Sequence, residues 1–208
     1  MKILGENTIV LDAIFISAVI ISSMFAYVFI MPRAVQPIFP MWVLDEYQRA
    51  PKSQMAVLTN ETSLLYIGVE NKMNSSEYCE IQVKFRNLSM PIPNTANSTA
   101  APLDSILSYY FFLAKDETWE TPFEFNLTGE ELNSSFILHD IEINNKMYEI
   151  NLKSDWIEEF NGYNYQVIFE LWLFDKPKEE FAFSGIWVTS PFLYIDLNQT
   201  MNDAVEST

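Results

Sequence analysis

Residues 69–89 read VENKMNSSEYCEIQVKFRNLS, and the second half of this stretch alternates between polar and apolar side chains. Successive side chains of a β-strand point to opposite faces, so the alternation predicts a strand with one face in the core. The polar face holds Tyr78, Glu80, Gln82 and Lys84, and the apolar face holds Cys79, Ile81, Val83 and Phe85.

The same period of two recurs along the chain after residue 62. It predicts strands at 63–70, 78–87, 108–115, 121–127, 136–143, 146–152, 163–175, 181–189 and 192–197. Eight or nine short strands separated by turn signals are typical of an antiparallel β-sandwich. Asn144 and Asn145 suit a tight hairpin turn, and residues 154–160 (SDWIEEF) suit one helical turn capped by Ser154.

A long apolar run precedes these strands. Residues 13–31 (AIFISAVIISSMFAYVFIM) carry no charge, and about 20 apolar residues cross the hydrocarbon core of a bilayer. A cleaved signal peptide would have a shorter apolar region and a small-x-small cleavage site. The run therefore predicts an uncleaved signal-anchor helix. Lys2 and Arg33 flank the span and barely set its orientation.

The predicted fold class is all-β: an antiparallel immunoglobulin-like β-sandwich ectodomain preceded by one N-terminal transmembrane α-helix. The immunoglobulin-like detail rests on Tyr165, two residues before Val167. In such sandwiches a tyrosine hydroxyl at this place ties the start of a strand to the preceding corner. The predicted organisation is a cytoplasmic N-terminus at 1–7, the span at 8–31, a Pro-rich membrane-proximal segment at 32–62, the β-sandwich at 63–197 and a polar tail at 198–208. Residues 88–107 form an unusually long Pro- and Asn-rich loop inside the sandwich.

Asparagine sequons indicate on which side of the membrane the domain lies. All seven follow the span, whereas roughly two would arise by chance, so the excess favours an exported, glycosylated domain. The alternative is that Asn, Ser and Thr merely share the turns. The glycosylation candidates are Asn60, Asn74, Asn87, Asn97, Asn126, Asn133 and Asn198.

The chain has one cysteine and a formal net charge of -16. A single cysteine gives no internal disulfide, so Cys79 is predicted to be a buried apolar residue, with a reactive thiol as the alternative. The strong negative charge excludes nucleic acid as a partner and disfavours adhesion to anionic lipid.

Residues for catalysis or metal binding are scarce. His139 is the only histidine, it alternates outward, and no G-x-S-x-G elbow accompanies it, which excludes a histidine-based triad. Acids stand near aromatics at 116–120 and 155–159, which leaves a carboxylate-based hydrolase open. No cofactor and no enzymatic activity are predicted.

The abundant aromatic residues point to recognition. Core packing accounts for most of them, and a protein interface or a sugar platform is the functional alternative. The residue 163–175 strand carries aromatics on both faces, so either a second layer or a partner covers the extra face. The candidate interaction residues are Trp119, Trp156, Trp172 and Trp187.

Several segments together resemble archaeal membrane-anchored proteins grouped as domain of unknown function 1616. The resemblance covers residues 39–190, and its most specific pieces are VENKMNSSEY with VKFRN, and ETWETPFEF. It implies an archaeal envelope location and an immunoglobulin-like ectodomain, and it carries no activity or catalytic residue.

We therefore predict a single-pass envelope protein whose glycosylated extracytoplasmic sandwich serves protein interaction as an accessory or scaffold subunit. Its expected partners are the membrane and a membrane protein or glycan. One alternative is a carbohydrate-binding module for envelope glycans, which needs a row of exposed Trp and Tyr on one face. The other is the hydrolase, which needs two acids about 5–10 Å apart in an aromatic-lined cleft.

Overall fold

The computed structural model describes residues 15–24, 38–160 and 162–195. The chain divides into two units, residues 1–36 and 37–208. Residues 15–24 are helical, and no helix in the described ranges combines the length and apolar character needed to cross a bilayer. The predicted segments 1–7 and 198–208, with Asn198, lie outside the described residues, as does most of the predicted span at 8–31.

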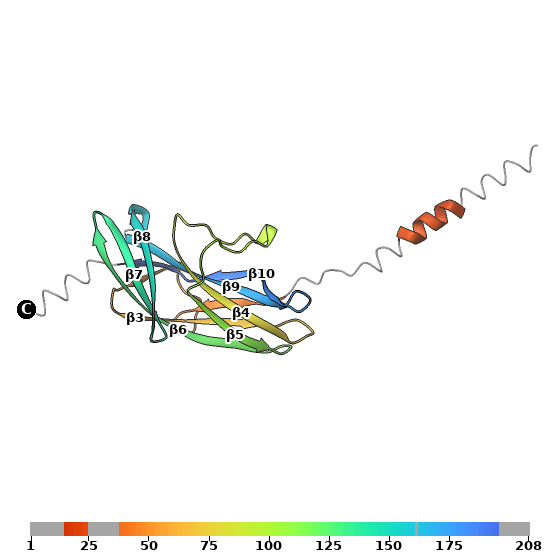
Figure 1. Cartoon of the computed structure of the whole chain (residues 1–208), viewed down its shortest axis with the longest axis horizontal. Coiled ribbons are helices and arrows are strands. Elements are labelled where there is room, and N and C mark those ends of the chain that lie inside the picture. Colours follow the sequence, from red (N-terminus) through yellow and green to blue (C-terminus); the bar gives the residue numbers. More distant parts are fainter. Residues whose placement is uncertain (1–14, 25–37, 161, 196–208) are drawn as a thin grey trace, which may run out of the picture. The chain divides into compact units, whose positions relative to one another are not determined.

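The second unit is built almost entirely of antiparallel β-strands (Figure 1). This confirms the all-β prediction. The strands are β1 (Met41–Leu44), β2 (Gln54–Val57), β3 (Thr62–Glu70), β4 (Glu77–Asn87), β5 (Leu107–Leu113), β6 (Thr118–Leu132), β7 (Ser135–Ile143), β8 (Lys146–Ile157), β9 (Gly162–Asp175), β10 (Glu180–Thr189) and β11 (Phe192–Ile195), with 3₁₀ turns η1 (Thr95–Asn97) and η2 (Glu158–Phe160).

The strands form two hydrogen-bonded sheets that meet at β8. The first sheet has the order β1-β3-β6-β7-β8, and every pair in it is antiparallel. In the second sheet, β5 pairs with β4, β4 with β9, and β10 and β11 follow one another along the other edge of β9. β2 joins β11 in the one parallel pair of the described strands. The last two residues of β8 pair with β9 and so join the two sheets.

The core lies between inward-facing side chains of the two sheets. Phe123 of β6 meets Phe169 of β9 edge-on, with ring centroids 5.2 Å apart. Cys79 is fully buried among these side chains, as the alternation of β4 predicts. Tyr165 is also buried, and its hydroxyl donates to the backbone oxygens of Phe136 (2.8 Å) and Leu152 (3.2 Å).

The strand predictions after residue 62 match the structure closely, and two differences stand out. β6 and β8 are longer than predicted. Residues 154–157 continue β8, and the helical turn predicted at 154–160 is confined to the 3₁₀ turn η2 at Glu158–Phe160. Ser154 caps no helix, because its hydroxyl is buried and donates to the backbone oxygen of Asn164. The Asn144-Asn145 hairpin turn is confirmed, and both residues have positive φ angles (48° and 64°), as a tight two-residue turn requires.

The β structure begins earlier than residue 63. Residues 32–62 were predicted to be a membrane-proximal segment, yet within their described part β1 pairs with β3, and β2 pairs with β11. The indole of Trp42 packs directly over Gly68, where a Cβ would stand 2.2 Å from a ring carbon. β1 and β2 have four residues each, too few for an alternation to be visible. Both are held by strands that are distant in the sequence.

Candidate functional site

The outer face of the second sheet carries a cluster of aromatic side chains from four adjacent strands. Tyr78 of β4 stacks on Phe112 of β5, with ring centroids 4.4 Å apart and 17° between the planes. On its other side Tyr78 contacts Phe174 of β9 (5.9 Å) and Phe181 of β10 (5.1 Å). Tyr110 of β5 completes the cluster at 5.6 Å from Phe181. We call these five residues the aromatic surface.

Two members of the aromatic surface are strongly exposed. Phe112 exposes 71% of its surface and Tyr110 exposes 57%, while Tyr78, Phe174 and Phe181 are partly buried. The Tyr110 hydroxyl donates to the buried carboxylate of Glu80 (3.0 Å), and this hydrogen bond raises the pKa of the Tyr110 phenol. Exposed rings that are held in place beside a partly buried cluster are typical of a contact surface for another molecule.

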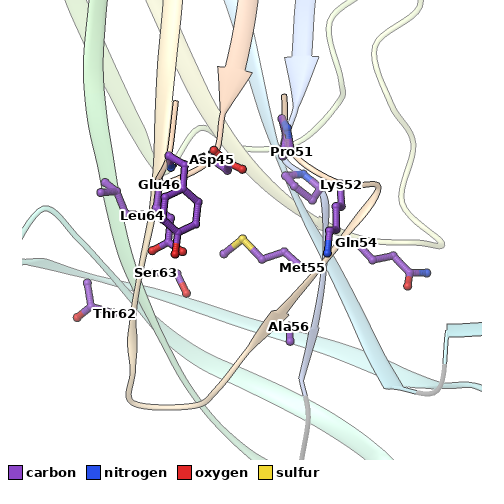
Figure 2. A pocket seen from close by; sticks show the side chains of 12 residues that line it. Asp45, Glu46, Pro51, Lys52, Gln54, Met55, Ala56, Thr62, Ser63 and Leu64 are labelled. Atoms are coloured by element: carbon purple, nitrogen blue, oxygen red, sulfur yellow. Dashed lines mark hydrogen bonds between the residues drawn. The ribbon is translucent and has the colours of Figure 1, made fainter. Parts of the chain in front are cut away.

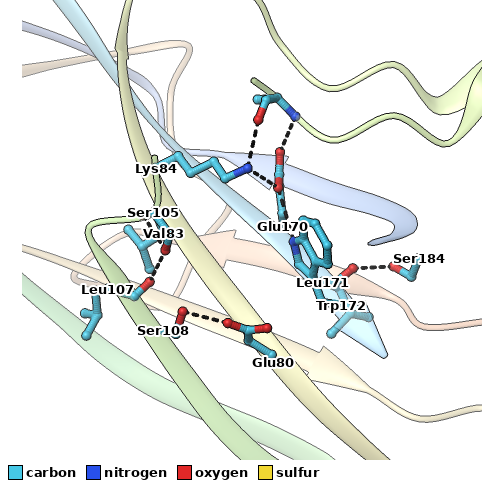
Figure 3. A network of polar contacts seen from close by, with 11 residues as sticks. Glu80, Val83, Lys84, Ser105, Leu107, Ser108, Glu170, Leu171, Trp172 and Ser184 are labelled. Atoms are coloured by element: carbon cyan, nitrogen blue, oxygen red, sulfur yellow. Dashed lines mark hydrogen bonds and ion pairs between the residues drawn. The ribbon is translucent and has the colours of Figure 1, made fainter. Parts of the chain in front are cut away.

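Beside the aromatic surface, the same face of the sheet carries a buried ion pair. The ammonium of Lys84 on β4 lies 2.8 Å from the carboxylate of Glu170 on β9, and both side chains are almost completely buried. The backbone N–H of Ala101 donates to Glu170 (2.6 Å), and Lys84 donates to the backbone oxygen of Ala101 (2.8 Å). The indole N–H of Trp172 donates to Glu170 as well (3.2 Å). Figure 3 shows Lys84, Glu170 and Trp172 converging, so both charges of the pair are also hydrogen-bonded to neighbouring groups.

Ala101 belongs to the long loop between β4 and β5, residues 88–106, which we call the strap. The strap covers the ion pair, and its short turn η1 lies against β10. There, a Cβ on Gly185 would stand 3.5 Å from the hydroxyl of Ser98. Its residues Ala101 and Pro93 are buried. The long loop predicted from composition is thus fastened to the sheet, and it leaves the aromatic surface uncovered.

The four candidate tryptophans do not form one site. Trp119 stacks on Phe111 with ring centroids 4.2 Å apart and the planes almost parallel. Trp156 is exposed and meets Tyr163 edge-on. Trp172 and Trp187 are partly buried on the second sheet, and Trp187 pairs with Glu170 across the strands. Trp172 and Trp187 thus both lie beside Glu170, whereas Trp119 and Trp156 lie elsewhere. The exposed aromatic cluster itself consists of tyrosine and phenylalanine.

The six sequon asparagines that the structure describes fall into two groups. Four are exposed in turns or in the strap: Asn60, Asn74, Asn97 and Asn133. Asn87 is held at the end of β4, where its amide donates to the backbone oxygen of Lys153 (2.8 Å) and its side-chain oxygen accepts from Ser89 and Met90. Asn126 is half-buried within β6, and its side-chain oxygen is buried without a hydrogen-bond partner in the described structure.

The surface hollows of the described structure and the buried Glu170 bear on the hydrolase alternative. A hollow of about 510 Å³ beside β2 has no acid in its lining. Another, of about 330 Å³, lies between the 45–52 turn and strands β2 and β3 (Figure 2). Its two acids, Asp45 and Glu46, are neighbours in one turn, and no acid faces them from the opposite wall. Glu170 is neutralised by Lys84 and covered by the strap. None of these places offers an open cleft between two carboxylates, the arrangement that glycoside hydrolysis needs.

Metal ligation is also unsupported among the described residues. They contain no group of three or more His, Cys, Asp or Glu side chains that could hold a metal ion. His139 is partly exposed and contacts Glu130 (3.3 Å) and Asn151 (3.5 Å), a surface position that agrees with its outward alternation.

Comparison with known proteins gives no family. No family model matches the chain, and no curated protein matches it. Among solved structures, a β-glucosidase from Listeria innocua in complex with glucose is 12% identical with a TM-score of 0.37, and the alignment covers 76% of this chain and 16% of that one. The sporulation control protein Spo0M from Bacillus subtilis is 13% identical with a TM-score of 0.27, covering 66% and 75%. The chain thus spans a small part of the glucosidase, and likenesses this weak support no functional argument.

Proposed function

We propose that this protein is a membrane-anchored interaction module, an accessory or scaffold subunit of the archaeal envelope, and that it binds a protein partner through the aromatic surface. The single observation that carries the proposal is the exposure of Phe112 and Tyr110 beside three partly buried rings. Burying such rings against a partner is favourable by about 25 cal/mol per Å² of apolar area. In this proposal the extracytoplasmic part is an immunoglobulin-like β-sandwich, it is glycosylated, and it has no enzymatic activity.

The position of the aromatic surface supports a partner that is itself in the membrane. The chain enters the β domain at Ile38, whose backbone contacts Lys72 and Met73 in the β3–β4 turn. Tyr78 follows that turn directly, so the aromatic surface lies at the same end of the β domain. Six residues separate Ile38 from the apolar run that ends at Met31.

Ring geometry favours a protein over a glycan as the ligand. Tyr78 and Phe112 are parallel and stacked, so they cover one face of each other. The other ring pairs in the aromatic surface are tilted by 38° to 69°. A flat platform for a sugar ring is therefore missing, whereas an irregular apolar surface suits a protein side chain.

Affinity capture from native membranes tests this function. Wild-type protein would be compared with Phe112→Ser and with Met147→Ser, a control because Met147 is 57% exposed on β8, where it pairs with β7 in the first sheet. After gentle cross-linking in mild detergent, we expect a stoichiometric membrane protein with the wild type and the control. Phe112→Ser should remove about 1.4 kcal/mol or more of binding free energy, and the yield of the captured membrane protein should fall at least tenfold. Equal recovery with Phe112→Ser, or no partner with the wild type, would refute the proposal.

A further inference from the structure

We infer that β5 is a self-association edge, at which two copies of this chain pair antiparallel, β5 against β5, and join their second sheets into one. This goes beyond the proposed function, because it concerns a second copy of the chain and not another protein. Within the described residues β5 pairs with β4 alone, so the hydrogen-bonding groups along its other edge meet no strand.

β5 lacks the features that keep exposed edge strands from pairing with other chains. Exposed edge strands are ordinarily kept short, charged, bulged or interrupted by proline, because a regular edge pairs with other chains. β1 and β2 have four residues each, and β10 carries a bulge between Phe183 and Ile186. β5 has seven residues, LSYYFFL, with no charge, no proline and no break in its register with β4.

Self-complementarity of the sequence is the second argument. When two β5 strands run antiparallel with Tyr110 on the two-fold axis, Leu107 faces Leu113 of the second copy. Ser108 then faces Phe112, Tyr109 faces Phe111, and Tyr110 faces Tyr110. No charged residue enters the pairing. This matters because a net charge of -16 makes two copies repel wherever their charged surfaces meet.

The exposure of the edge rings is the third argument. Phe112 and Tyr110 lie on the edge strand β5, and they are the most exposed members of the aromatic surface. Side chains on adjacent strands stabilise one another when they lie opposite on the same face. An added β5 strand would place a second pair of these rings beside the first, and the aromatic surfaces of the two copies would become continuous.

Cysteine cross-linking at the two-fold axis tests the pairing. Tyr110→Cys would place two thiols opposite each other, with Cα atoms about 4.5–5.5 Å apart, a separation that a disulfide spans. Met147→Cys is the control, since Met147 and Tyr110 are equally exposed at 57%. The native Cys79 is buried and its pKa is raised to about 12, so the introduced thiol is the reactive one.

Under mild oxidation of the full chain in detergent, we expect a covalent dimer with Tyr110→Cys and none with Met147→Cys. Analytical ultracentrifugation of the wild type should show a dimer that dissociates on dilution, and Phe112→Lys should shift it to monomer by placing like charges along the edge. Equal cross-linking of the two cysteine variants, or a monomeric wild type at every concentration, would overturn the inference. Membrane-partner capture by a monomeric wild type would leave the proposed function standing and assign the β5 edge to that partner.

Discussion

Removing one member of the buried Lys84–Glu170 pair should destabilise the β domain severely. At an effective dielectric constant of about 20, two unit charges 2.8 Å apart attract by about 6 kcal/mol. Desolvation of two buried ions costs several kcal/mol each, so the net value of the intact pair is small. Lys84→Met leaves the Glu170 carboxylate buried without its counter-charge, which should lower the free energy of unfolding by about 3–5 kcal/mol.

A double variant measures the interaction between Lys84 and Glu170 apart from their other contacts. Lys84→Met combined with Glu170→Met removes both charges and leaves the Ala101 amide and the Trp172 indole without their acceptor. A buried donor without an acceptor costs about 1–3 kcal/mol. The double variant should therefore lose far less stability than the sum of the two single variants, giving a favourable coupling energy of several kcal/mol.

Urea unfolding of the full chain in detergent, followed by tryptophan fluorescence, measures these free energies. Proteolysis gives a second measurement, because Asp104 is the only acidic residue of the strap. An Asp-specific protease should cut there faster in Lys84→Met than in the wild type, since the strap loses its attachment at Ala101. Strictly additive losses, each below about 1 kcal/mol, would show that the pair is not shielded from water and would refute the argument.

Three further perturbations have clear expected results. Burial raises the pKa of the Cys79 thiol to about 12 from 9.0, so the thiol should resist iodoacetamide at pH 8 until the protein unfolds. The folded chain favours the protonated thiol, so the contribution of Cys79 to the free energy of unfolding is complete below pH 9 and is lost as the pH rises toward 12. Urea midpoints measured between pH 8 and 11 would show this loss. Gly68→Ala should displace Trp42 and release β1, and we expect a shifted fluorescence maximum and a lower Tm. Asn87→Ala should cost about 1–3 kcal/mol because its side chain serves four hydrogen bonds, whereas Asn97→Ala in the exposed η1 should change stability by less than about 0.5 kcal/mol in the same urea assay.

Most of the β structure could be predicted because the sequences of the long strands carry a period of two. β3, β4, β7, β9 and β10 each have nine or more residues, enough for the period of two to be visible. β1 and β2 could not be found in this way, since four residues fit many patterns. Their positions depend on pairing with distant strands, information that a local pattern does not contain.

The aromatic surface was only partly predictable from the sequence. The aromatics on both faces of β9 indicated that one face needed a cover or a partner. The choice of tryptophans rested on residue type, however, and the actual cluster depends on strand register. Tyr78 and Phe112 are 34 residues apart in the chain and stack because β4 and β5 pair with those residues opposite. No spacing rule gives that register in advance.

Glu170 is a charged residue within an otherwise apolar strand, and it indicates how the outer face of β9 is covered. It interrupts the apolar run VIFELWLF at residues 167–174, and every described residue of β9 from 162 to 171 is buried, so the outer face of this strand must be covered. Lys84 occupies the polar face of β4, where the alternation suggested contact with solvent. Charges are retained in a protein interior only when they are paired and hydrogen-bonded. The segment that covers Lys84 and Glu170 must therefore supply hydrogen bonds to them. The strap supplies them at Ala101, so the long Pro- and Asn-rich loop is part of the sheet's packing. The strap leaves Phe112 and Tyr110 of β5 exposed, and we propose these rings as the part of this face that binds a partner.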